Sequence, residues 1–296
     1  MNRLMEPECI WDAGAHLGEG ALWHAATRSV YFVDIKGGRI HRCAADGSRR
    51  RSWEAPGQPG FVVPAASGSL VCALEDGLYR MSEATGEFTP LRRVEEDLPG
   101  NRFNDGYVDA GGNLWFGSMD DGQVRPTGAL YRLDRDGALA RADDGYIITN
   151  GPAISPDGRT LYHTDTPLRR VYAFDLAFDP RAGGLLANKR VFLQLPEGSR
   201  PDGMAVDSEG HLWIALFGAG RIERYTAAGR LVGAVRFPCS NITKLAFGGD
   251  DLCTAYVTTA WKGLSPEQRA AQPLAGGLFA FRVDTPGLPH NVLALG

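Results

Sequence analysis

Cysteine is scarce in this sequence and is never paired. The 296 residues contain 5 cysteines, an odd number, and no C-x-x-C motif. Disulfide scaffolds and thiolate zinc sites need paired or closely spaced cysteines, so both are excluded. We therefore expect a cytoplasmic protein whose cysteines are buried in strands as small apolar side chains. These are Cys9, Cys43, Cys72, Cys239 and Cys253.

Clusters of basic residues and membrane-type segments are equally scarce. The formal net charge is -4, and the longest basic run is Arg49–Arg51. A nucleic-acid surface needs a basic stripe that releases counterions, so we expect no nucleic-acid partner. The uncharged stretch 55–74 contains proline and glycine residues that would break a spanning helix, and residues 1–7 lack the apolar run of a signal peptide. We expect no membrane association, and a monomer or weak oligomer.

Several common catalytic motifs are absent as well. The 6 histidines form no H-E-x-x-H motif. No G-x-S-x-G elbow is accompanied by a suitable Ser, His and Asp arrangement, and no G-x-G-x-x-G follows a strand and opens a helix. These absences argue against a helical zinc protease, a serine hydrolase of the elbow type and a dinucleotide-binding fold.

What the sequence does contain is a repeat of short apolar runs typical of strands. The steps between the central residues of these runs measure from 40 to 51 residues, and clusters of Gly, Asp, Asn and Pro precede several of the runs. The central residues are Tyr31, Val71, Trp115, Tyr162, Trp213 and Tyr256. Propeller blades of four strands repeat every 40–50 residues or so. The sequence predicts an all-β, six-bladed β-propeller as a single domain over residues 1–296; a β-sandwich or an eight-stranded barrel would not show this period.

Two segments lie outside the regular units. We expect residues 8–12 to supply the outer strand of the sixth blade. Residues 265–271 are the only helix-like stretch, with Ser265 as N-cap and Pro266 at the first helical position. We interpret this helix as an insertion in the last blade.

A polar residue occupies one phase of the repeat in most units. Glu19, Asn104, Asn150 and Asp202 lie 11 or 12 residues before the aromatic marker of their unit, and Asn241 lies 15 before. If the first strand of each blade lines a central channel, these side chains point toward one axis. Asn and Asp also commonly start turns, so a turn role at these positions stays open. Glu is not a turn former. Oxygen ligands of this kind, two of them anionic, suit Ca, Mg, Mn, Fe(II) or Zn, and a cation would relieve carboxylate repulsion.

Seven short motifs resemble the SMP-30/gluconolactonase/regucalcin-like family. They follow in the same order along nearly the whole chain, at residues 17–20, 102–106, 118–119, 149–151, 155–158, 201–203 and 247–249. The resemblance implies a six-bladed propeller that hydrolyses sugar lactones with one divalent cation. It implies Glu19, Asn150 and Asp202 as metal ligands, Arg102 and Asn104 as substrate contacts, and Asp202 also as the catalytic base. Later segments look more like the bacterial pentonolactonases, such as xylonolactonases.

The sequence departs from this pattern at one place. Animal members have a further acidic substrate contact shortly after Ser/Thr-Met, where this chain has Asp120 and Asp121. Either aspartate can take that role, so the preferred sugar, a pentonolactone or a gluconolactone, stays open. Two other functions also stay open: a metal-binding propeller of the regucalcin type without turnover, and a hydrolase of non-sugar esters or lactones. Trp261, in a predicted loop near the channel, is a candidate lid residue.

Overall fold

The computed structural model describes residues 6–177 and 185–295, and its regular secondary structure is nearly all β-strand. Six four-stranded sheets, each with antiparallel neighbours, account for these strands. Six sheets of blade length confirm the predicted six-bladed β-propeller and are not the arrangement of a sandwich or a single barrel. Among the described helices, none has the length and apolar character to cross a membrane. The chain clusters into two compact units, which are described in turn; the single domain stays a prediction.

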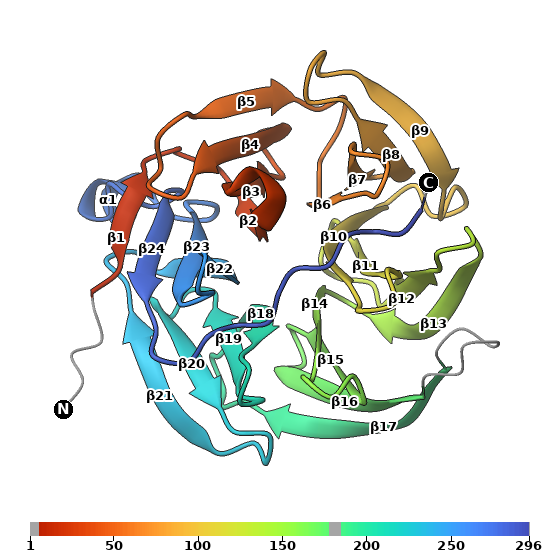
Figure 1. The fold of residues 1–296 in the computed structure, drawn as a ribbon. Coiled ribbons are helices and arrows are strands. Elements are labelled where there is room, and N and C mark those ends of the chain that lie inside the picture. Colours follow the sequence, from red (N-terminus) through yellow and green to blue (C-terminus); the bar gives the residue numbers. More distant parts are fainter. Residues whose placement is uncertain (1–5, 178–184, 296) are drawn as a thin grey trace. The chain divides into compact units, whose positions relative to one another are not determined.

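The first unit comprises Met1–Glu54 and Gly198–His290 and holds three sheets (Figure 1). They are β2 (Gly18–His24), β3 (Ser29–Asp34), β4 (Arg39–Ala44) and β5 (Arg51–Glu54); β18 (Pro201–Val206), β19 (Leu212–Leu216), β20 (Arg221–Tyr225) and β21 (Leu231–Arg236); and β22 (Asn241–Gly248), β23 (Thr254–Ala260), β24 (Leu278–Arg282) and β1 (Glu8–Trp11). The short 3-10 turn Ala25–Thr27 links β2 to β3. The first strands β2 and β18 both pack against β22.

The second unit comprises Ala55–Glu197 and Asn291–Gly296 and holds the other three sheets. They are β6 (Phe61–Pro64), β7 (Leu70–Leu74), β8 (Gly77–Met81) and β9 (Phe88–Arg93); β10 (Asn101–Val108), β11 (Leu114–Asp120), β12 (Gly128–Leu133) and β13 (Leu139–Tyr146); and β14 (Thr149–Ile154), β15 (Thr160–Asp165), β16 (Arg170–Ala177) and β17 (Leu185–Gln194). The first strands β6 and β14 both pack against β10.

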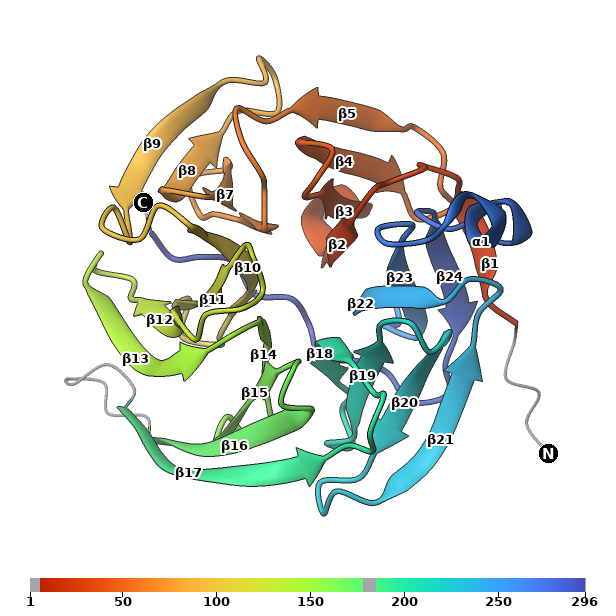
Figure 2. The ribbon, with the colours of Figure 1, turned by 180° about the vertical axis from the view of Figure 1, so that it is seen from behind.

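The strand from the start of the chain completes the last sheet, as the sequence predicts. Glu8 of β1 pairs with Ala280 of β24 in antiparallel register (Figure 2). The turn from β4 to β5 lies against this strand: Gly47 has φ 77, and a Cβ there would come 2.1 Å from the carbonyl oxygen of Ile10. A larger residue at position 47 would therefore push β1 away from its sheet.

The aromatic markers of the repeat are core residues. Tyr31, Trp115, Tyr162, Trp213 and Tyr256 are all buried. Trp23 is also buried and stacks on Tyr256, with ring centroids 5.7 Å apart. The repeat period therefore reflects the packing between blades. The cysteine prediction is confirmed for Cys43 on β4 and Cys72 on β7. Cys239 is buried but lies between β21 and β22, and Cys9 and Cys253 are half-buried.

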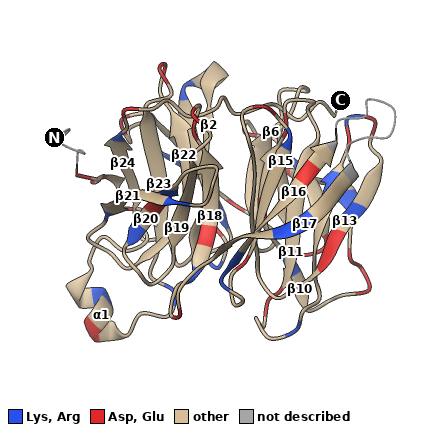
Figure 3. Ribbon diagram, turned by 90° about the horizontal axis from the view of Figure 1, so that it is seen from below, with Lys and Arg blue, Asp and Glu red and all other residues tan. Residues whose placement is uncertain are grey.

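The predicted helix is present as α1 (Pro266–Ala271) in the first unit. The Ser265 side chain accepts a hydrogen bond from the backbone N–H of Gln268, and the Gln268 side chain in turn accepts one from the backbone N–H of Ser265. This capping box satisfies donors that the first turn would otherwise leave unpaired. The helix has no buried residue and projects beyond the ends of its neighbouring strands (Figure 3).

Candidate functional site

A chain of hydrogen bonds joins five side chains of the second unit. The Arg102 Nε donates to Asp121 at 2.8 Å, and its Nη1 donates to the Asn104 oxygen at 2.7 Å. The Asn104 Nδ2 donates to the Asn150 oxygen at 3.0 Å. The Asn150 Nδ2 donates to the Thr166 hydroxyl at 2.8 Å. The structure thus brings together both predicted substrate contacts and one predicted metal ligand.

This network is buried, which fixes its geometry. Arg102 is 2% exposed, and Asn104 and Asn150 are also buried. A buried guanidinium is costly unless it is paired and hydrogen-bonded, and here Asp121 supplies the negative charge. Asn104 also donates to the backbone oxygen of Thr149 at 2.6 Å, so its amide is held from two sides. The side chains are preorganised before any ligand binds.

Of the two candidate aspartates, Asp121 is the one that contacts Arg102. Asp120 instead stabilises the following turn, where it accepts hydrogen bonds from the backbone N–H groups of Val124 and Arg125 and from the Arg125 side chain. These bonds, led by the backbone N–H of Arg125, lower the pKa of Asp120 to about 2. Asp121, and not Asp120, is therefore the aspartate that contacts Arg102, and the substrate contact of either stays a prediction.

The other two predicted metal ligands are buried carboxylates of the first unit. Glu19 on β2 is 3% exposed, and Asp202 on β18 is 7% exposed. Thr243 of β22 lies next to both: its hydroxyl donates to the backbone oxygen of Gly18 at 2.5 Å, and its backbone oxygen would lie 2.8 Å from a Cβ at Gly203. Glu19 follows Gly18, and Asp202 precedes Gly203. Both carboxylates therefore have a neighbour in the chain that lies against Thr243.

A register shift accompanies the polar phase of the repeat. In five blades, the pairing between the first and the second strand shifts register at or next to the polar residue. These residues are Glu19, Asn104, Asn150, Asp202 and Asn241. The β6–β7 pair belongs to the blade that has no polar residue at this phase of the repeat, and its register shows no shift. Bulges reorient side chains and are frequent beside active sites. The bulges support a functional interpretation of these positions over a simple turn.

The donor chemistry of the predicted ligand set fits a hard or borderline cation. Glu19 and Asp202 offer carboxylate oxygens and Asn150 an amide oxygen, as Ca, Mg and Mn prefer and as Fe(II) and Zn accept. Among the described residues, no three His, Cys, Asp or Glu side chains gather as a metal site. The predicted ligand set contains only two carboxylates, Glu19 and Asp202, and its third ligand is the amide of Asn150. It is therefore not a site of the kind that is absent. The three-residue site stays a prediction.

Trp261 is a fixed part of its loop. The His16 ring stacks on it at 4.0 Å between centroids, and the Arg269 guanidinium carbon lies 4.0 Å from the ring centroid. Its indole N–H donates to the backbone oxygen of Gly14 at 3.0 Å. Since His16 and Arg269 already pack against the ring, we do not interpret Trp261 as a stacking platform for a sugar.

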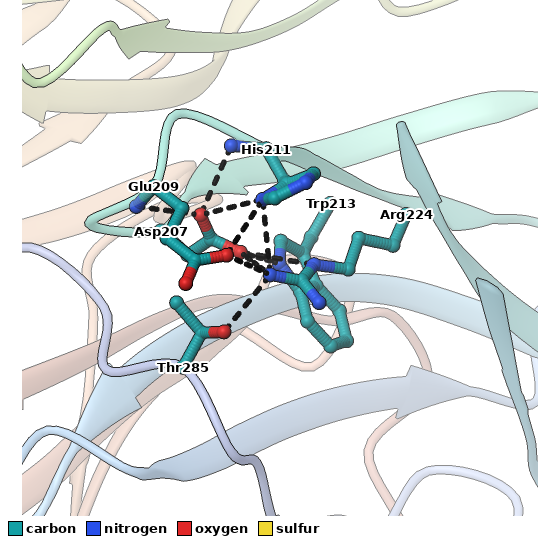
Figure 4. A network of polar contacts seen from close by, with 6 residues as sticks. All are labelled: Asp207, Glu209, His211, Trp213, Arg224 and Thr285. Carbon is teal, nitrogen blue, oxygen red and sulfur yellow. Dashed lines mark hydrogen bonds and ion pairs between the residues drawn. The ribbon is translucent and has the colours of Figure 1, made fainter. Parts of the chain in front are cut away.

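A second polar network, which the sequence reasoning missed, surrounds Asp207 just beyond the end of β18 (Figure 4). Asp207 accepts hydrogen bonds from the Trp213 indole N–H at 2.9 Å and from Arg224 Nη2 at 2.6 Å, and Arg224 also donates to Thr285. Burial raises the pKa of Asp207, but hydrogen bonds from Trp213, the His211 backbone and Arg224 outweigh it and lower the pKa overall.

The same arrangement occurs in the second unit. Asp109 accepts a hydrogen bond from the Trp115 indole N–H at 2.8 Å, with the same sequence spacing as Asp207 and Trp213. Both aspartates directly follow the first strand of their sheet, whereas Asn104 and Asp202 lie within that strand. The repeated spacing is the signal by which the sequence could have revealed these residues. We interpret both as structural.

Comparison with known proteins gives a consistent result. Residues 17–261 match the family profile described as SMP-30/Gluconolactonase/LRE-like region. The chain is 32% identical over 292 residues to a 6-deoxy-6-sulfogluconolactonase of Pseudomonas putida, covering 97% of this chain and 98% of that protein. It is 37% identical over 278 residues to an L-arabinolactonase of Azospirillum brasilense, covering 92% and 90%. The crystal structure of regucalcin from Agrobacterium tumefaciens, described as a calcium-binding protein, superposes with a TM-score of 0.92 at 27% identity, covering 98% and 97%.

Proposed function

Because this chain belongs to the SMP-30/gluconolactonase/LRE-like family, we propose that it hydrolyses an aldonolactone to the aldonic acid with one divalent cation. The chain is an enzyme, a sugar lactonase, as are two relatives that match it over nearly their full length. Its partner is therefore a small sugar lactone. The names of the relatives cover both a pentonolactone and a substituted gluconolactone, and we propose a substrate from these two classes.

The observation that carries the proposal is the buried network from Asp121 to Asn150. It joins the residues proposed to hold the sugar, Arg102 and Asn104, directly to a residue proposed to hold the cation. A non-catalytic metal site would not need a buried arginine linked to one of its ligands through Asn104. The network therefore favours a lactonase over a metal-binding propeller without turnover.

Each residue of the site has a proposed role. Glu19, Asn150 and Asp202 would hold the cation, which supplies Lewis-acid polarisation of the lactone carbonyl when it is bound. Asp202 would accept a proton from the attacking water and return it to the ring oxygen as the ester bond breaks. Arg102, oriented by Asp121, would donate hydrogen bonds to sugar hydroxyls and favour the negative charge of the product.

A panel of lactones and metals tests this proposal. We expect enzyme stripped by a chelator to lose most of its activity on xylono-, arabino-, galactono- and gluconolactone, and to regain it with at least one of Fe(II), Mn, Zn, Ca or Mg. The rate of spontaneous hydrolysis must be subtracted. Absence of turnover with every metal would favour the non-catalytic alternative, and faster turnover of aryl esters or homoserine lactones would favour a non-sugar substrate.

Thr166 is expected to orient the amide of Asn150 for metal binding. Its hydroxyl accepts the hydrogen bond from Asn150 Nδ2, which directs the amide oxygen the other way. Removing such a supporting contact typically weakens metal binding 10–100-fold or so. We expect Thr166→Val to raise the Kd for Mn²⁺ about 10-fold in calorimetric titration, and Thr166→Ser to restore most of the affinity.

Thr164 offers a matched control for this experiment. It is buried on β15, two residues before Thr166, and pairs with Asn150 through the backbone, but its hydroxyl has no hydrogen-bond partner among the described residues. Thr164→Val should leave the Kd for Mn²⁺ unchanged. Equal weakening by Thr164→Val and Thr166→Val would show that the effect is one of packing and not of amide orientation.

A further inference from the structure

A cavity of about 500 Å³ opens on the first blade of the first unit, beside the β2–β3 and β4–β5 turns. Its lining contains four arginines but a single acidic residue. These are Arg28, Arg42, Arg49, Arg51 and Asp46. Within a chain of net charge -4, such a concentration of guanidinium groups makes a locally positive surface that attracts anions.

Two of the arginines belong to neighbouring strands and are held in place by aromatic rings. Arg42 of β4 donates from its Nε to the Ser29 hydroxyl at 3.0 Å, and its guanidinium carbon lies 5.7 Å from the Tyr31 ring centroid. Arg51 of β5 is the cross-strand partner of Arg42, and its guanidinium carbon lies 4.6 Å from the Trp53 ring centroid. Two like charges that face each other across neighbouring strands favour the binding of an anion beside them.

The other two arginines are exposed and stand at backbone positions that favour glycine. Arg28 has φ 49 and Arg49 has φ 50, which strains any residue with a Cβ. The Arg28 N–H donates to the carbonyl oxygen of Ala25, three residues earlier. In the same turn, four other blades make this bond with a glycine of positive φ and the last blade makes it with Leu252; the glycines are Gly68, Gly112, Gly158 and Gly210. An arginine kept at a strained position indicates a use for its side chain.

The acidic side chains near the cavity are engaged at its rim. Asp250 forms a mostly exposed salt bridge with Arg28, at 2.7 Å. Asp46 accepts a hydrogen bond from the backbone N–H of Ser48 at 2.9 Å. Hydrogen bonds from the Ser48 hydroxyl and backbone lower the pKa of Asp46, and the charge of Arg49 adds to this effect. Among the described residues, Arg49 forms no salt bridge, so its guanidinium can pair with a ligand.

We propose that this cavity binds the phosphate group of a small molecule, with guanidinium groups from both turns and both strands pairing with its oxygens. A phosphate carries about two negative charges on tetrahedrally arranged oxygens. Several guanidinium groups can therefore contact it at once, whereas a carboxylate offers one charge and two oxygens. The cavity volume lies within the range of roughly 300–1,000 Å³ for small-molecule sites. This inference goes beyond the proposed lactonase function and does not depend on it.

Calorimetric titration of the whole chain with phosphate compounds tests the proposal. Inorganic phosphate and pyrophosphate probe for an inorganic anion, fructose 1,6-bisphosphate probes for a phosphorylated sugar, and acetate serves as the comparison. We expect at least one phosphate compound to bind at one site per chain, about 10-fold more tightly than acetate, because it makes more charge-assisted hydrogen bonds. The affinity should fall in 0.5 M NaCl, because salt screens exposed charges.

Two variants locate the binding at this cavity. Arg49→Gln and Arg28→Gly each remove one guanidinium, so each should raise the Kd of the tightest phosphate compound about 10-fold. Glycine adopts φ 49 without strain, so Arg28→Gly should melt at the wild-type temperature or above it. Weaker binding by Arg28→Gly is then not a result of misfolding.

Arg230 provides the matched control. It is an exposed arginine in the corresponding turn of another blade of the same unit, between β20 and β21, and does not belong to the lining of this cavity. Arg230→Gln should leave the Kd unchanged. Phosphate compounds that bind no more tightly than acetate, or a Kd that neither Arg49→Gln nor Arg28→Gly alters, would overturn the inference, whatever the lactonase activity.

Discussion

Replacing Asp202 by Asn is expected to lower kcat on a sugar lactone by about 1,000-fold at saturating metal. The substitution keeps an oxygen that can ligate the cation but removes the basic carboxylate. General acid–base groups contribute roughly 10²–10⁴ to the rate, so the loss should lie in this range. Because asparagine has almost the same size as the buried Asp202 of β18, the fold should be retained.

Metal affinity must be measured on the same variant. A weaker affinity alone would show that Asp202 acts as a ligand, whereas a low kcat with metal bound shows that its basicity is needed. Asp202→Ala removes both functions and should lose activity and affinity together. Turnover near the wild-type rate in metal-loaded Asp202→Asn would contradict the role as base.

Replacing Asp207 by Ala is expected to destabilise the fold by about 3 kcal/mol, because it removes the buried carboxylate of the partly buried Arg224 guanidinium and leaves only the exposed Glu209 as its anionic partner. Asp207 is 0% exposed, and it accepts hydrogen bonds from Trp213, Arg224 and the His211 backbone. Urea denaturation followed by tryptophan fluorescence measures the change in the free energy of unfolding. Since Asp207 lies away from the proposed site, kcat of the folded variant should stay near the wild-type value.

The pair of Arg28 and Asp250 provides the control. Its N–O distance of 2.7 Å is close to the 2.6 Å of Arg224 and Asp207, but both of its side chains are mostly exposed. Exposed ion pairs contribute about 0–1 kcal/mol, so Asp250→Ala should have little effect. Equal destabilisation by both variants would refute the buried role of Asp207.

The pH dependence of stability follows from the lowered pKa of Asp207. A carboxyl whose pKa is lower in the folded state stabilises the fold above its unfolded pKa, which is about 3.9. This contribution is lost as the pH falls through that value and toward the lower folded pKa. The difference in stability between wild type and Asp207→Ala should therefore shrink as the pH is lowered below about 4.

The fold was predictable because blade packing repeats in the sequence. Each aromatic marker is buried on the second strand of its blade, so the strand period is visible without any long-range information. The capping residues of α1 and the apolar segment before the first blade were also local signals. Local patterns do not contain the division into two compact units, which depends on contacts between residues far apart in the chain.

The site was predictable in part, and the register shifts explain why. Glu19, Asn150 and Asp202 share a phase because each lies at a bulge of a first strand. The choice between Asp120 and Asp121 was not predictable, since it depends on which way the chain turns after β11. Thr166 follows β15 whereas its partner Asn150 lies on β14, so no local motif connects the two residues.

The pairing of Glu8 with Ala280 has a consequence for how the protein is made. The ribosome produces β1 first and its partner β24 almost last, so β1 must wait through most of synthesis before its sheet can close. Contacts between such distant residues carry a large entropic cost and form late. Until then the edge of β1 is unpaired, and an unpaired strand edge is open to pairing with other chains.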